Sequence, residues 1–178
     1  EEAMRQLCPW WTPDVTNCTQ QQLHTEAVDD ADATLVLIGE HNTTNAVVLQ
    51  HMLQMLGFPS DLVDDGEKVL EALKLQTYRV VLLDDKMPRL SGPDCARKIL
   101  EAFPDAAARP SIVAVTSDVF SVKECIAAGI ELFVTKPVHL CHLEAVLQRC
   151  FPQWHPVRLP SSDAIETPFD RALRQLRM

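Results

Sequence analysis

The sequence is poor in basic residues, in glycine and in long apolar runs. Lysine and arginine total 16 against 25 acidic residues, and the resulting formal charge of −9 argues against nucleic-acid binding, which needs a clustered basic surface. No apolar run approaches the roughly 20 residues of a membrane-spanning helix, so direct insertion into a membrane is not expected. The chain opens Glu-Glu, without a signal-like segment, and we expect a cytoplasmic protein.

The cysteines form no CxxC pair, which argues against the commonest metal and redox motifs. Four of the six lie in segments with a helical apolar pattern, where cysteine behaves as a small buried apolar side chain; we expect thiols, not disulfides. One segment gathers histidine and cysteine at a spacing that matches no zinc pattern: His139, Cys141, His142 and Cys150.

Short apolar runs alternate with helical patterns along the middle of the chain. The three most apolar runs begin at residues 35, 80 and 112, and weaker ones lie at 61–63 and 132–134. Such alternation predicts an α/β protein with a doubly wound parallel sheet and helices on both faces. The three most apolar runs are expected to be its central strands.

Helical spacing also predicts which side chains are buried. Thr43 or Thr44 is expected to cap the first helix, and Gly57 to end it. The expected buried faces are Val48, Met52, Met55 and Leu56 in this helix, and Val122, Cys125 and Ile126 in the helix before Gly129.

Polar residues follow several of these strands where each one ends. Asp84 directly follows the run 80–83, and Thr116 and Lys136 follow the last two strands. Ligands of open parallel sheets bind beyond the carboxyl ends of the strands. An oxygen nucleophile, a hydroxyl and an ammonium suit phosphoryl transfer, in which Asp84 attacks while a metal ion, Thr116 and Lys136 balance the charge.

These residues match a known family. The chain resembles, over about residues 34–150, the response-regulator receiver domain of two-component phosphorelays, of the type attached to hybrid histidine kinases. The motifs that carry the resemblance are Glu40-His41-Asn42 with Asn45, Leu56-Gly57, Asp65-Gly66, Leu83 to Pro88 with Gly92, Val115-Thr116-Ser117, Ala127-Ala128-Gly129 and Phe133 to Pro137.

The resemblance implies a flavodoxin-like (βα)5 fold with strand order 2-1-3-4-5 and a cis Lys136–Pro137 bond. It implies that Asp84 accepts a phosphoryl group from phosphohistidine and that Thr116 and Lys136 contact it. Thr116 and Phe133 would form the switch pair. Mg²⁺ would be held by Glu40, Asp84 and the backbone carbonyl of Lys86.

The resemblance also implies a signalling domain, not an enzyme. Its partner would be a histidine kinase or a histidine phosphotransfer protein. The domain would be tethered where its parent kinase is membrane-bound. Its signal would pass through the surface formed by residues 119–133 and 139–150.

His41 departs from the family pattern, which has a metal-binding carboxylate at this position. Mg²⁺ prefers oxygen ligands, so His41 is a doubtful ligand that would weaken Mg²⁺ binding or favour Mn²⁺. The alternative is a pseudo-receiver, which keeps the fold as a phosphorylation-independent interaction module. A metabolic enzyme on the same scaffold is a third interpretation, but residues 39–42 form no glycine-rich phosphate loop.

The ends of the chain differ from its middle in composition. Residues 1–33 are polar and lack steady periodicity, so we expect a linker or N-terminal extension there. Residues 34–150 form the predicted receiver domain. Residues 151–178 carry spaced prolines and are expected to form a C-terminal tail with a short helix.

Overall fold

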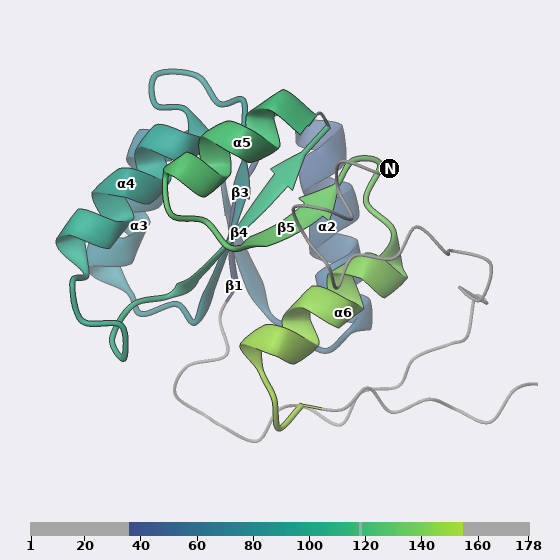
Figure 1. Ribbon diagram of the computed structural model, residues 1–178. Coiled ribbons are helices and arrows are strands. Elements are labelled where there is room, and N and C mark those ends of the chain that lie inside the picture. The colour runs from purple at the N-terminus through teal and green to yellow at the C-terminus, as the bar shows by residue number, and fades with distance from the viewer. Residues whose placement is uncertain (1–35, 118, 155–178) are drawn as a thin grey trace, which may run out of the picture.

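A single parallel sheet organises the protein (Figure 1). The computed structural model describes residues 36–117 and 119–154. The five strands are ordered β2-β1-β3-β4-β5, which confirms the predicted order and the predicted central strands. The strands are β1 (Val36–Gly39), β2 (Ser60–Val63), β3 (Val80–Asp84), β4 (Ser111–Thr116) and β5 (Leu132–Thr135). The helices are α2 (Thr43–Met55), α3 (Gly66–Leu75), α4 (Gly92–Ala102), α5 (Val119–Ala127) and α6 (Leu140–Cys150).

Helices cover both faces of the sheet and create two apolar cores (Figure 1). Strand β3 serves both cores, because successive side chains of a strand point to opposite faces. Val80 and Leu82 pack with residues of α2 and α6, whereas Val81 and Leu83 pack with residues of α3, α4 and α5. All four are buried, as expected for a central parallel strand.

Helix α2 follows the expected burial only in part: Leu56 is buried and Met52 packs against the core as expected, but the other two residues are exposed. Its buried residues are Ala46, Leu49 and Leu53, whereas Val48 is 44% and Met55 36% exposed, so these two assignments were wrong. Apolar residues lie on more than one side of this helix, and periodicity alone therefore did not select the packed side. The predicted cap was also wrong: the Asn42 side chain accepts hydrogen bonds from the backbone N–H groups of Thr44 and Asn45.

The other helices follow the sequence pattern more closely. In α5, Val122 and Cys125 are buried as expected, but Ile126 is 41% exposed. Cys95, Cys125, Cys141 and Cys150 carry thiols rather than disulfides; Cys8 and Cys18 lie outside the described residues. Within the described ranges, no helix is both long and apolar enough to cross a membrane.

Aromatic residues after α6 pack back onto the domain. The ring of Phe58 lies 5.0 Å from that of Phe151 and 4.8 Å from that of Trp154. The predicted N-terminal extension (1–33) and the rest of the predicted tail (155–178) lie outside the described residues. The boundaries of the domain therefore stay predictions.

Candidate functional site

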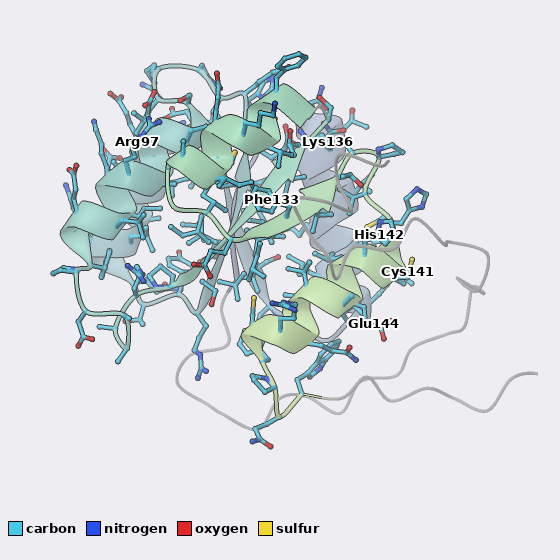
Figure 2. The ribbon with its side chains drawn as sticks, viewed as in Figure 1. Arg97, Phe133, Lys136, Cys141, His142 and Glu144 are labelled. Atoms are coloured by element: carbon cyan, nitrogen blue, oxygen red, sulfur yellow. The ribbon has the colours of Figure 1, made fainter. Side chains whose placement is uncertain are left out.

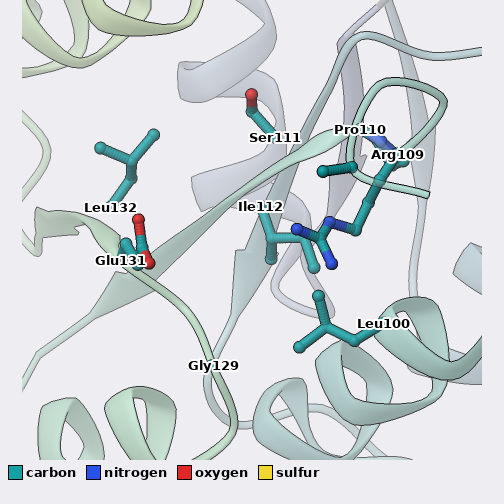
Figure 3. Close-up of a pocket in the computed structure, with 9 residues that line it drawn as sticks. Leu100, Arg109, Pro110, Ser111, Ile112, Gly129, Glu131 and Leu132 are labelled. Atoms are coloured by element: carbon teal, nitrogen blue, oxygen red, sulfur yellow. The ribbon is translucent and has the colours of Figure 1, made fainter. Parts of the chain in front are cut away.

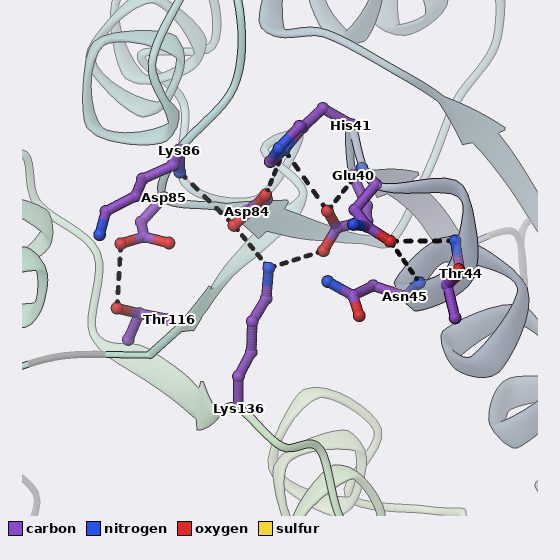
Figure 4. Close-up of polar contacts among 10 residues, drawn as sticks. Glu40, His41, Thr44, Asn45, Asp84, Asp85, Lys86, Thr116 and Lys136 are labelled. Atoms are coloured by element: carbon purple, nitrogen blue, oxygen red, sulfur yellow. Dashed lines mark hydrogen bonds and ion pairs between the residues drawn. The ribbon is translucent and has the colours of Figure 1, made fainter.

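The carboxyl ends of three strands bring an ammonium group between two carboxylates (Figure 4). Lys136 follows β5, and its Nζ lies 2.8 Å from Asp84 Oδ1 at the end of β3 and 2.7 Å from Glu40 Oε2 after β1. Both carboxylates are almost fully buried. The structure thus brings together three residues that are far apart in the sequence, as expected for parallel strands that end at one edge.

The turn after β3 is held close to the start of α4. Gly92 begins α4, and its N–H donates to the carbonyl oxygen of Asp85. A Cβ atom at Gly92 would overlap the backbone of Asp84, so only glycine fits here without displacement. The Lys136–Pro137 peptide bond at the end of β5 is cis, as the family resemblance implied.

His41 contacts both carboxylates from the more exposed side of the site. Its Nδ1 lies 2.8 Å from Asp84 Oδ2 and 3.5 Å from Glu40 Oε1. Because a carboxylate oxygen can only accept, Nδ1 is the donor in the contact with Asp84. The N–H of Asn42 donates to Glu40 Oε1 at 2.9 Å and holds that side chain in place.

Glu40, His41 and Asp84 offer ligand atoms that all lie within 4.8 Å of one another. This donor set of two carboxylates and one imidazole fits a divalent cation that accepts both oxygen and nitrogen, such as Mn²⁺. Mg²⁺ finds two of its preferred oxygen ligands here and one poor substitute. The N–H of Lys86 lies 3.4 Å from Asp84 Oδ1, and the role of its carbonyl as a ligand stays a prediction.

The three ionisable groups, two buried carboxylates and a partly buried ammonium group, respond differently to their surroundings. Burial raises the pKa of Asp84 to about 6, against the opposing effect of the hydrogen bond from Lys136. Burial also acts to raise the pKa of Glu40, but the hydrogen bonds from Lys136 and Asn42 outweigh it and lower this pKa. For Lys136, burial acts to lower the pKa, yet both carboxylates together raise it. Lys136 is thus paired with both carboxylates, and Asp84 is the one whose pKa stays raised despite that contact.

Replacing Asp84 with asparagine is expected to stabilise the fold in metal-free buffer. A carboxyl group with a raised folded-state pKa favours folding below the unfolded value of 3.8, and this contribution is lost as the pH rises through about 6. Above that pH we expect Asp84→Asn to raise the free energy of unfolding by about 3 kcal/mol. The gain in the free energy of unfolding should disappear near pH 4, to within about half a pH unit.

Urea unfolding across this pH range, with EDTA present, measures the effect. Glu71→Gln is the control, because Glu71 is an exposed carboxylate of α3. Equal stability of wild type and Asp84→Asn at every pH would contradict the conclusion that burial of the Asp84 carboxylate destabilises the fold.

Thr116 lies at the same edge of the sheet but contacts a different carboxylate. Its Oγ1 donates to Asp85 Oδ2 at 3.2 Å, and both side chains are buried. The expected contact between Thr116 and a phosphoryl group on Asp84 stays a prediction. Phe133, the other predicted switch residue, is buried in β5 below Lys136 (Figure 2).

Asp85 is a site residue that the sequence pattern did not assign a role. The signal was available, because adjacent strand residues point in opposite directions and Asp85 must therefore face away from Lys136. What the sequence could not supply was the register of β3 and β4, which pairs Asp84 with Val115 and brings Thr116 beside Asp85.

A cavity of about 210 Å³ lies far from these groups (Figure 3). Ser111 and Ile112, at the start of β4, line it together with Gly129 and Glu131. The polar cluster lies at the other end of the strands, so this cavity takes no part in its chemistry.

Comparison with known proteins agrees with the fold. The sequence model of the response regulator receiver domain matches residues 36–148. The aerobic respiration control sensor protein ArcB of Escherichia coli (strain K12) is 31% identical over 129 residues, which cover 70% of this chain and 16% of ArcB. The chain thus spans about a sixth of the length of the curated relatives it matches.

Solved structures show the same fold. The receiver domain of sensor histidine kinase PA1611 from Pseudomonas aeruginosa PAO1, with a magnesium ion in its active-site cleft, is 28% identical with a TM-score of 0.61. The match covers 68% of this chain and 99% of that domain. The receiver domain of Ssk1, solved with the histidine phosphotransfer protein Ypd1 of Saccharomyces cerevisiae, is 22% identical with a TM-score of 0.60. The match covers 69% of this chain and 95% of that chain, and at this identity it supports the fold alone. The extent of the family match, with the strand order that the fold requires, shows that this chain belongs to the response regulator receiver domain family.

Proposed function

We propose that this domain accepts a phosphoryl group from a phosphohistidine onto the Asp84 carboxylate, and acts as a phosphorelay signalling domain rather than an enzyme with a separate substrate. The observation that carries the proposal is the position of Lys136 Nζ between the buried carboxylates of Asp84 and Glu40. Attack by an Asp84 oxygen forms a P–O bond as the P–N bond of the donor breaks. The products are an aspartyl phosphate and a neutral histidine.

Charge balance explains why Lys136 is placed between the carboxylates. Transfer adds negative charge beside two buried acids, and a fixed ammonium group stabilises it without reorganisation. A divalent cation bound by Glu40, Asp84 and the Lys86 carbonyl would supply the remaining positive charge. We propose that His41 weakens Mg²⁺ at this position and that Mn²⁺ replaces it well, whereas the PA1611 domain was solved with magnesium.

The partner we propose is a histidine kinase or a histidine phosphotransfer protein. ArcB is a sensor protein, and the Ssk1 receiver was solved in complex with such a phosphotransfer protein. A domain joined to a kinase would work in the cytoplasm and be tethered where that kinase is membrane-bound. The 80% exposed Phe120 of α5 agrees with an output surface formed by α5, β5 and α6.

Helix α2 supplies an apolar surface next to the acceptor. It starts two residues after His41, and three of its apolar residues are exposed: Val47 (62%), Val48 (44%) and Met55 (36%). A phosphohistidine can reach Asp84 only from the open edge of the sheet, so we propose that the donor protein docks on this face of α2. Exposed apolar side chains next to a functional site are a common feature of protein interfaces.

Val47→Glu is therefore expected to slow phosphoryl transfer from a phosphorylated histidine phosphotransfer protein by about tenfold. Transfer from acetyl phosphate should not change, because that donor needs no docking surface. Stopped-flow or gel-based transfer assays, with a donor that phosphorylates the wild type, measure both rates. Leu75→Glu is the matched control, since Leu75 is an exposed apolar residue of α3. Equal slowing by both variants would contradict docking on α2.

The phosphoacceptor function is tested by the intact mass of the protein after incubation with acetyl phosphate and Mg²⁺ or Mn²⁺. We expect a gain of one phosphoryl group that hydroxylamine removes, as an acyl phosphate requires. No gain with any divalent metal would overturn the function and favour the second candidate, a pseudo-receiver. That candidate is motivated by His41, whose ring lies where the family has a carboxylate ligand, and it predicts partner binding that Asp84→Ala does not change.

A further inference from the structure

The hydroxyl group expected to contact the phosphoryl group is already engaged by a second buried carboxylate. Thr116 Oγ1 donates to Asp85 Oδ2 at 3.2 Å, and the two side chains are only 1% and 6% exposed. Figure 4 shows this contact set apart from the cluster around Asp84. The hydrogen bond joins the ends of β3 and β4, so it is part of the resting structure of the site.

The backbone fixes Asp85 firmly in this position. Its N–H donates to the carbonyl oxygen of Val115, and its own carbonyl oxygen accepts from the N–H of Gly92. Its side chain therefore points toward β4, while the side chain of Asp84 points toward Lys136 and His41. The two adjacent carboxylates serve different contacts and cannot exchange roles without breaking the strand end.

A threonine hydroxyl has one proton to donate. To donate it to a phosphoryl oxygen on Asp84, Thr116 must withdraw it from Asp85. A buried carboxylate that loses a hydrogen-bond donor is left less well solvated, and this opposes the change. Asp85 and the phosphoryl group therefore compete for the same proton.

We propose that Asp85 is a positioning residue that holds Thr116 in the resting orientation and opposes the phosphorylated state. This inference rests on the proposed phosphoacceptor function, because the competing acceptor is a phosphoryl group on Asp84. The hydrogen bond to Asp85 therefore keeps Thr116 in place until Asp84 carries phosphate. Only then does Thr116 leave Asp85, and the residues of β4 and β5 around Thr116 rearrange.

The test measures the affinity of the protein for beryllofluoride, which attaches to an aspartate as a stand-in for a phosphoryl group, in the presence of Mn²⁺ or Mg²⁺. Asp85→Ala is expected to tighten this affinity by about tenfold. In a Thr116→Val background the same change should have no effect, since no hydroxyl remains to be released. Asp85→Asn, of nearly the same size, should tighten it by a smaller factor of about three, because an amide oxygen accepts more weakly than a carboxylate.

The γ-methyl NMR signal of Thr116 in the protein without beryllofluoride gives a readout that does not need phosphorylation. In Asp85→Ala this methyl signal should shift toward the position that it has in the beryllofluoride-bound wild type. If the wild type forms no adduct, the signal should still shift away from its position in the free wild type. An unchanged affinity and signal in both Asp85 variants would overturn the inference, as would an equal gain in the Thr116→Val background. If the wild type itself forms no adduct, the proposed function fails, and the methyl signal alone decides whether Asp85 holds Thr116. Should Asp85→Ala not fold, Asp85→Asn decides by the same criteria.

Discussion

Asp84→Asn is expected to reduce phosphoryl transfer from acetyl phosphate by a factor on the order of a thousand or more. The amide that replaces the carboxylate has no nucleophilic oxygen of comparable strength, and Lys136 then faces a neutral side chain. The variant should be at least as stable as the wild type above about pH 6, so that a loss of transfer cannot be attributed to unfolding.

A matched control is available at the next residue. Asp85→Asn changes a buried carboxylate of the same strand end, but one that faces Thr116 and not Lys136. We expect it to keep phosphoryl uptake. The two variants, compared by rate of mass gain under identical conditions, separate the loss of the acceptor from the loss of a nearby negative charge. Equal loss in both would mean that general charge, and not Asp84 itself, governs uptake.

His41→Asp is expected to raise the affinity for Mg²⁺ by about a hundredfold and that for Mn²⁺ by much less. The variant places a third oxygen ligand and a further negative charge beside Glu40 and Asp84. The imidazole of the wild type lowers the affinity for Mg²⁺ more than the affinity for Mn²⁺, because Mn²⁺ accepts nitrogen ligands more readily. The wild type should therefore prefer Mn²⁺, and the variant should largely lose this preference.

Titration of the wild type and of His41→Asp with each metal, monitored by calorimetry or by tryptophan fluorescence, measures this change in affinity. His51→Asp adds the same charge at an exposed position of α2 and serves as the control for non-specific attraction. Tight Mg²⁺ binding by the wild type, unchanged in His41→Asp, would show that the imidazole does not act on the metal.

The sheet could be predicted from the sequence because its signals are local. Runs such as 80–83 have the length and apolar character of buried strands, and the ends of parallel strands converge at one edge. This reasoning alone predicted that Asp84 and Lys136 would lie together, and the structure places them 2.8 Å apart.

Other features depend on information that a single sequence does not contain. Helix α2 has apolar residues on several sides, and only its packing on the sheet shows that Leu49 is buried while Val48 is not. The contact between Thr116 and Asp85 depends on strand register. The orientation of the His41 ring toward Asp84 depends on a side-chain rotamer that no sequence pattern specifies.

The most direct measurement is chemical trapping of the phosphoryl group after reaction with acetyl phosphate and Mn²⁺. Borohydride reduces an acyl phosphate of aspartate to homoserine, and peptide mass spectrometry then locates the changed residue. We expect homoserine at position 84 and nowhere else in the chain, and none when acetyl phosphate is omitted. An aspartate reduced at any other position, or a phosphorylated protein with residue 84 intact, would contradict the assignment of Asp84 as the acceptor.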